Sequence, residues 1–151
     1  MRVTLMAAAA SLALAGVAYA AADPAIEKAV TTRQANFKTM GKSFKALSEA
    51  LAASPADLNA VRQNAQTLAN TAAVQPGLFP KGSGPESGLK MEAKADIWSD
   101  NANFVRLQRD NIAAAQALAS AAQGGDVAAI QKARGALGST CKACHEKFKS
   151  S

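Results

Sequence analysis

The sequence has few aromatic residues: they make up 5% of the 151 residues, and tryptophan and tyrosine occur once each. β-strands favour aromatic and β-branched residues, whereas this chain is rich in alanine, the strongest helix former. We therefore expect neither an all-β nor a parallel α/β fold. After the N-terminus, no stretch reaches the roughly 18 to 20 apolar residues that a bilayer-spanning helix needs. We expect no membrane span in the mature chain.

Residues that carry catalytic chemistry are also scarce, since the chain has one histidine and two cysteines. It shows no catalytic carboxylate pair, no nucleophile beside a base and no phosphate-binding loop, so we do not expect an enzyme. The formal net charge is +6. No aromatic residues interleave the lysines, as they do where a protein stacks on nucleic acid bases, so we expect no nucleic acid partner.

Residues 1–20 have the pattern of a secretory signal peptide. Arg2 provides a basic start, Leu5 to Val17 an apolar run, and Ala18-Tyr19-Ala20 a small-x-small cleavage site. The alternative is a buried or membrane-anchoring helix, but the run is short for that purpose. We expect cleavage after Ala20, export to the periplasm and a single mature domain over residues 21–151.

Helix signals divide the mature chain into four segments. Asp23-Pro24 and Ser54-Pro55 each place an N-cap acceptor before a proline at the first helical position. Residues 75–88 contain three prolines and four glycines, which predicts a long crossover loop. A third helix is expected to resume before Ile97 and to end at Gly124-Gly125, and a fourth to follow Asp126. This pattern predicts an all-α fold, an antiparallel four-helix bundle.

The first helix carries one apolar stripe, in which bulky residues recur at steps of three and four. Its members are Ile26, Val30, Phe37, Met40, Phe44, Leu47 and Leu51. Arg33 occupies the step four residues before Phe37, so a cation falls on the inward side. A buried guanidinium needs an anion. The alternative is that the long Arg33 side chain extends to the edge of the bundle.

Cys141-Lys142-Ala143-Cys144-His145 is the attachment pattern of c-type haem. On a helix, residues three apart share one face. Two thiols can therefore add to the two vinyl groups of one porphyrin while the adjacent imidazole reaches the iron. The pattern predicts one covalent haem c per chain, with Cys141 and Cys144 as attachment points and His145 as an axial iron ligand.

Three other interpretations of the two cysteines are open. A thioredoxin-like dithiol would make the chain a thiol-disulfide oxidoreductase, but that chemistry belongs on a strand-to-helix turn of a sheet protein. A zinc site wants four ligands, and only three soft ones are present. A disulfide across so short a loop would stabilise the fold little.

The chain resembles the cytochromes c′, the class II cytochromes c of bacterial periplasms. The resemblance rests on the C-terminal haem motif, the four-helix pattern, the segment Ile97-Trp98-Ser99-Asp100, and Arg33-Gln34 followed by a bulky residue at position 37. It covers nearly all of the mature chain. It implies a four-helix bundle with a covalent haem, and a homodimer formed through the first two helices.

The resemblance also bears on the iron position opposite His145. In the low-spin relatives, the cytochromes c-556, the ligating methionine lies four residues after the arginine that matches Arg33. Phe37 occupies that position here and cannot ligate. The resemblance therefore implies a five-coordinate, high-spin iron that binds NO or CO when the ring moves aside. Plain core packing is the alternative role of Phe37, and ligation by Met40, as in a low-spin electron carrier, is the alternative for the iron.

Further residues receive expected roles from the same resemblance. Arg33 is assigned to a haem propionate, and Lys149 matches a basic residue on the histidine side of the haem. The positions that resemble haem neighbours of the family are Gln34, Phe79, Glu92 and Trp98. Lysines near an exposed haem edge would also attract an acidic redox partner. Lys142, Lys147 and Lys149 are expected at the haem end, and Lys38, Lys42 and Lys45 on the outer face of the first helix. The alternative is that these lysines simply form a solvated face.

Overall fold

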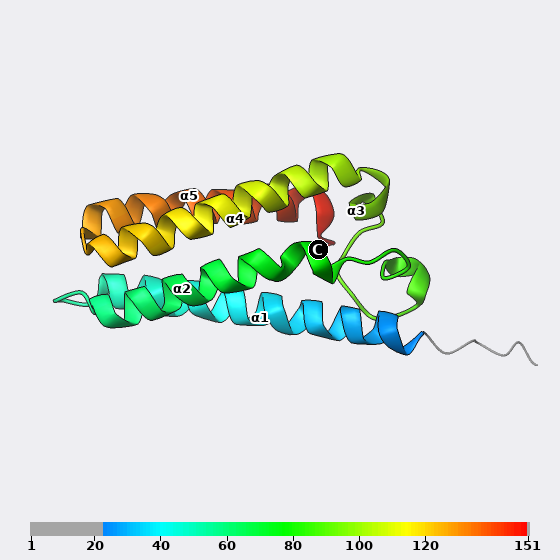
Figure 1. Cartoon of the computed structure of the whole chain (residues 1–151), viewed down its shortest axis with the longest axis horizontal. Helices are drawn as coiled ribbons and strands as arrows, with labels where there is room; N and C mark the ends of the chain where they lie inside the picture. Colours follow the sequence, from blue (N-terminus) through cyan, green and yellow to red (C-terminus); the bar gives the residue numbers. More distant parts are fainter. Residues whose placement is uncertain (1–22, 151) are drawn as a thin grey trace, which may run out of the picture.

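The structure is a computed structural model that describes residues 23–150. The predicted signal peptide, residues 1–20, lies outside the described residues. Four long helices form the bundle: α1 (Pro24–Ala52), α2 (Leu58–Val74), α4 (Asn101–Gly124) and α5 (Val127–Phe148). Successive long helices run in opposite directions, so the predicted antiparallel four-helix bundle is confirmed (Figure 1). Within residues 23–150, no helix is long and apolar enough to cross a membrane.

The helices pack as a ring in which α1 lies along α2, α2 along α4, and α4 along α5. The seam between α1 and α5 differs, because it opens into the cavity described below. The N-terminal end of α1, the crossover loop and the C-terminal end of α5 meet at one end of the bundle (Figure 1). The fold therefore brings residues from distant parts of the chain to this end.

The start of α1 is as predicted. The Asp23 carboxylate accepts a hydrogen bond from the backbone N–H of Ala25 at 2.8 Å, and Pro24 occupies the first turn. The predicted start of the second helix at Ser54-Pro55 is wrong. α2 begins at Leu58, because the Asp57 carboxylate caps it by accepting from two backbone N–H groups, at 3.0 and 3.1 Å. A cap that satisfies two otherwise unpaired donors fixes the helix start.

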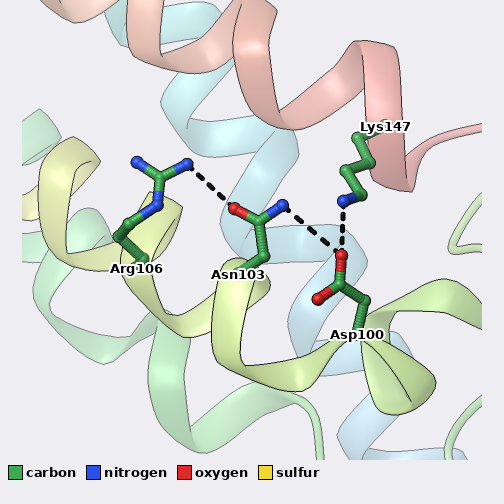
Figure 2. Close-up of polar contacts among 4 residues, drawn as sticks. All are labelled: Asp100, Asn103, Arg106 and Lys147. Atoms are coloured by element: carbon green, nitrogen blue, oxygen red, sulfur yellow. Dashed lines mark hydrogen bonds and ion pairs between the residues drawn. The ribbon is translucent and has the colours of Figure 1, made fainter.

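The third predicted helix is broken into α3 (Asp96–Ser99) and α4, with Asp100 outside helical geometry between them. Its carboxylate accepts hydrogen bonds from Lys147 at the end of α5 and from Asn103, which in turn accepts one from Arg106 (Figure 2). Asp is a weak helix former whose side chain competes for local polar contacts. The non-local contact with Lys147 therefore holds a corner where periodicity predicted a continuous helix.

The crossover loop is irregular, as predicted, apart from two short 3-10 turns, η1 (Gln75–Leu78) and η2 (Pro85–Ser87). Past the loop, α4 ends as predicted before Gly125, which has a left-handed φ of 76° that favours glycine. The Asp126 carboxylate then caps α5 by accepting from the backbone N–H of Ala128.

Two apolar clusters fill the bundle. The larger one runs along its middle and consists of leucine, valine, isoleucine and alanine side chains with Met40. The smaller one lies at the end where the loop and α3 pack, and its buried members are Ile97, Phe104, Leu107 and Phe148. The Phe104 and Phe148 rings meet edge to face, with centroids 5.2 Å apart. These two clusters flank the cavity.

Candidate functional site

A cavity of about 930 Å³ separates α1 from α5. Its walls are mostly apolar and include Phe37, Met40, Phe44, Leu68, Phe79, Ile97, Phe104, Leu107, Leu137 and Phe148. Protein interiors are close-packed, with few voids larger than a water molecule. An apolar cavity within the roughly 300–1,000 Å³ typical of ligand sites therefore indicates space for a large bound group.

The three residues of the sequence motif all line this cavity from the last two turns of α5. The Cys141 and Cys144 thiols are free and half-buried. Burial raises the pKa of both thiols, and raises that of Cys144 to about 11, with a smaller contribution from Cys141. At neutral pH both sulfurs are therefore protonated thiols rather than thiolates.

These thiols do not suit redox catalysis. Reactive dithiols depend on a thiolate stabilised at a helix N-terminus or by a nearby cation, which lowers the pKa. Here the pair lies near the C-terminal end of α5 and its pKa values move the opposite way. Among the described residues, no three His, Cys, Asp or Glu side chains converge as metal ligands, so the zinc interpretation has no support.

His145 is exposed, and its pKa is affected by the charges of two neighbouring residues. Partial burial lowers the pKa of His145, and the Lys149 cation lowers it further, while the Glu92 carboxylate opposes them. Lys149 and Glu92 form an ion pair with an N–O distance of 3.1 Å, and both line the cavity. A lowered pKa keeps the imidazole neutral, the form that binds a metal.

The opposite wall of the cavity comes from α1, where Phe37 and Met40 lie one turn apart. Phe37 is 36% exposed and its ring meets the Phe79 ring at 6.2 Å between centroids. The Phe37 ring therefore packs against Phe79 and also faces the cavity, so both expected roles of Phe37 stay open. Met40 is buried, and its sulfur accepts a hydrogen bond from Gln75 at 2.9 Å.

Arg33 is only 3% exposed, so its predicted alternative place at the bundle edge is wrong. Its guanidinium donates to the backbone oxygens of Leu78 and Ser83 at 3.4 and 3.0 Å and to the Ser83 hydroxyl at 3.2 Å. It also contacts the Met91 sulfur at 3.5 Å. Among the described residues no carboxylate pairs with this guanidinium, and neutral oxygens accept its hydrogen bonds; the predicted propionate partner would belong to the haem. Burial lowers the pKa of Arg33, yet an arginine stays charged.

The remaining predicted neighbours divide into two groups. Gln34 lines the cavity and donates to the backbone oxygen of Lys90 at 2.9 Å, and Phe79 lines it beneath Arg33. Trp98 does not line the cavity. It packs behind Phe79, 6.4 Å between ring centroids, and its indole N–H donates to the backbone oxygen of Pro80. Trp98 therefore supports the wall from outside, because the break at Asp100 sets the position of α3.

Three buried amide side chains in the cavity wall were not predicted: Gln75, Gln108 and Asn111. For two of them, the sequence position already indicated burial. Gln108 and Asn111 fall on the inner stripe of α4, four residues after Phe104 and Leu107 respectively. Polar side chains at such positions are costly unless paired, which marks them as candidates for a specific role.

The cavity fits a haem on observations of this structure. It offers two adjacent thiols, a neutral imidazole, apolar walls for the porphyrin ring and a buried cation that no carboxylate within residues 23–150 pairs with. Such a cation suits the acidic groups of the porphyrin edge. In a haem-containing protein, Cys141, Cys144, His145 and Arg33 would hold the group, which supplies ligand binding and electron transfer at iron.

Comparisons with known proteins agree with this site. The family model described as Cytochrome C' matches residues 28–149. A cytochrome c′ of Rhodospirillum rubrum is 39% identical over 149 residues, which cover 98% of this chain and 97% of the relative. A solved cytochrome c′ described as having an unusual ligand-controlled dimer dissociation superposes with a TM-score of 0.78 at 25% identity, covering 86% of this chain and all of that one.

A second solved structure is a nitric oxide complex of a variant of cytochrome c prime from Alcaligenes xylosoxidans. It superposes with a TM-score of 0.74 at 28% identity and covers 83% of this chain and 97% of that one. The family match spans all four long helices and the cavity that they enclose. On this evidence, the chain belongs to the cytochrome c′ family of haem proteins.

Proposed function

We propose that this chain is a periplasmic haem c protein that binds NO or CO, with one haem attached through Cys141 and Cys144 and His145 as the axial ligand. The single observation that carries the proposal is the composition of the two cavity walls. One wall presents two protonated thiols and a neutral imidazole, and the other presents the Phe37 ring. A bound haem would supply an iron that binds small ligands, and Phe37, which cannot ligate, would lie on the wall across from His145.

The residues around this face select ligands by size and polarity. A phenyl ring donates no hydrogen bond, which disfavours dioxygen relative to NO and CO, since dioxygen gains most from a polar donor. Phe37 lies in the cavity wall and is only partly covered, and we propose that its ring moves aside when NO or CO binds. The nitric oxide complex of the Alcaligenes xylosoxidans relative supports NO as a ligand of this family site.

Ligation by Met40, which would give a low-spin electron carrier, is the competing candidate. The Met40 sulfur accepts the Gln75 amide hydrogen bond and is held among the larger apolar cluster. That contact points the sulfur lone pair at an amide N–H. We therefore assign Met40 to packing, and a Met40→Leu variant should keep the absorption spectrum of the native protein.

Electron transfer is a second function that one observation favours. Three exposed lysines, Lys38, Lys90 and Lys149, belong to the cavity lining together with Glu92, which pairs with Lys149, so positive charge predominates where a haem edge would lie. Charge of one sign around a redox centre speeds the encounter with a partner of opposite sign, in this case an acidic protein. The rate of electron transfer between this protein and an acidic partner should therefore fall as salt is added.

We also propose that this chain forms a homodimer through α1 and α2. The cytochrome c′ with a ligand-controlled dimer dissociation supports this state. Sedimentation of the purified holoprotein, with and without CO, tests it. A monomer at all concentrations would contradict the proposed dimer.

The proposed function is tested on holoprotein exported to the periplasm. Absorption and electron paramagnetic resonance spectra of the ferric protein should show high-spin iron, and the ferrous protein should bind CO and NO. In Phe37→Met, a thioether replaces the ring, so the ferric protein should become low-spin; Phe44→Met, also on the α1 wall, is the matched control and should stay high-spin. A low-spin native protein, or a high-spin Phe37→Met variant, would contradict the assignment of Phe37. A colourless product would contradict the haem itself.

A further inference from the structure

A chain of amide hydrogen bonds crosses the bundle in the wall of the cavity. The Gln75 side-chain nitrogen donates to the Met40 sulfur at 2.9 Å and to the Asn111 side-chain oxygen at 3.2 Å. The Asn111 nitrogen donates in turn to the Thr140 hydroxyl at 2.9 Å and to the Cys141 sulfur at 3.6 Å. One connected set of contacts therefore joins α1, η1, α4 and α5 and ends on an attachment cysteine.

The chain is deeply buried and nearly complete. Gln75 is 4% exposed and Asn111 is 5% exposed. Thr140 donates its own hydroxyl proton to the backbone oxygen of Leu137 at 2.8 Å, which leaves its lone pairs for Asn111. A buried amide costs free energy unless it is paired. Both polar ends of the Asn111 amide are paired here, and its position is therefore fixed from two sides.

The two attachment cysteines are not equivalent in this arrangement. Cys141 receives the Asn111 hydrogen bond, whereas among residues 23–150 no side-chain donor contacts the Cys144 sulfur. A thioether sulfur keeps its lone pairs, so it can accept the same N–H after a haem is attached. Asn111 is thus placed to act on one attachment point and not on the other.

We propose that Asn111 is a positioning residue for Cys141, and that Gln75 holds the Asn111 amide in place for this purpose. Asn111 fixes the Cys141 side chain, and through it one edge of the haem, against α4. The Cys144 side chain has no such hydrogen bond and packs against the smaller apolar cluster. This inference rests on the proposed function for its haem, but it concerns residues that the proposed function leaves without a role.

A double-mutant cycle on the holoprotein tests the pairing. Asn111→Leu is made in the native chain, in Cys141→Ala and in Cys144→Ala, where one thioether remains. The measured quantity is the folding equilibrium constant, the ratio of folded to unfolded protein. If Asn111 acts through the Cys141 sulfur, Asn111→Leu should lower this constant by about two- to fivefold more in the native and Cys144→Ala chains than in Cys141→Ala, the coupling expected for a direct contact. Asn111→Ser, which is too short to reach the sulfur, is the second variant in case Asn111→Leu does not fold.

A spectroscopic signature separates positioning from packing. In proton NMR spectra of the ferric holoprotein, the chemical shifts of the paramagnetically shifted Cys141 β-protons should change in Asn111→Leu. The chemical shifts of the Cys144 β-protons should not change. The matched control is Gln108→Leu, one turn away on α4, whose amide nitrogen contacts neither sulfur and pairs with no group in the described part of the chain. It should show no coupling to Cys141→Ala.

Equal effects of Asn111→Leu in all three backgrounds, or unchanged Cys141 resonances, would overturn the inference while leaving the haem assignment intact. If the purified native protein shows no haem absorption, the proposed function is overturned, and this inference with it. The two failures therefore give different observations.

Discussion

The guanidinium of Arg33 lies 4.7 Å from the centroid of the Phe79 ring, and this contact joins α1 to the crossover loop. The same guanidinium is the donor for the backbone oxygens of Leu78 and Ser83. Arg33 thus organises the loop with its own hydrogen bonds, in addition to the role toward a haem propionate that we propose for it. Its position explains why a cation interrupts the apolar stripe of α1.

Replacing Arg33 with methionine should destabilise the protein by about 1–3 kcal/mol, because it leaves buried carbonyl oxygens without a donor. Urea unfolding of the holoprotein measures the change. Arg106→Met is the control, since Arg106 pairs with the side chains of Asp110 and Asn103 at the surface and should cost less than about 1 kcal/mol. Equal losses in the two variants would contradict the structural role of Arg33.

Gln108→Leu should stabilise the protein by about 1 kcal/mol. The Gln108 side-chain nitrogen is buried and finds no hydrogen-bond partner among residues 23–150, and such a group costs about 1–3 kcal/mol. Gln75→Leu is the matched comparison, because Gln75 is equally buried but paired, and it should destabilise. Thermal unfolding of both holoproteins decides the prediction, which fails if the two substitutions change stability in the same direction.

Two glycine substitutions should act in opposite directions. Gly135 lies inside α5, where an added methyl group would meet nothing within 4 Å apart from its chain neighbours and the backbone of its own helix, so Gly135→Ala should stabilise by about 0.5–1 kcal/mol through helix propensity. At Gly84 a Cβ atom would lie 2.8 Å from the Trp98 ring, and Gly84→Ala should cost about 1–3 kcal/mol through overpacking. Circular dichroism melting curves compare the two. A stable Gly84→Ala protein would show that Trp98 can move.

The Asp100 corner should make stability depend on acid. Hydrogen bonding by Lys147 is the main cause that lowers the pKa of Asp100 from its ordinary 3.8, with Asn103 adding to it. A lowered carboxyl pKa means that the unfolded state binds the proton first, so this stabilisation is complete above about pH 4 and is lost as pH falls through the lower folded value.

Asp100→Asn should therefore flatten the loss of stability below pH 4, as measured by unfolding across a pH series at low salt. Asp110→Asn removes the same charge from α4 and is the matched control, because Asp110 belongs to an exposed ion pair within one helix, which contributes little to stability. It should leave the acid dependence close to that of the native protein. Identical pH curves for Asp100→Asn and the native protein would contradict the prediction.

Much of the fold was predictable because the signals are local. The Asp23 cap, the glycine stop after α4 and the Asp126 cap each depend on a few neighbouring residues. The second helix start was mispredicted because two valid caps, Ser54 and Asp57, lie three residues apart, and sequence alone does not rank them. The break at Asp100 was missed because its partner, Lys147, is distant in the chain.

The candidate site divides in the same way. Cys141, Cys144 and His145 were found from their spacing on one helix, and that spacing places all three at the cavity. Trp98, a predicted haem neighbour, does not line the cavity, because its position depends on how α3 packs behind Phe79. Gln75 was missed altogether, since it begins the loop, where no periodic pattern indicates burial.

By itself, the amino-acid sequence determined that residues 23–150 form four long helices and present two thiols and an imidazole from the end of the last one. Helix periodicity, caps and motif spacing are properties of neighbouring residues, so they can be recognised in the chain alone. Only the tertiary structure decided that Arg33 is buried against neutral oxygens and that Gln75 and Asn111 connect Met40 to Cys141. These contacts join residues that are far apart in the chain, and they form only when the helices pack.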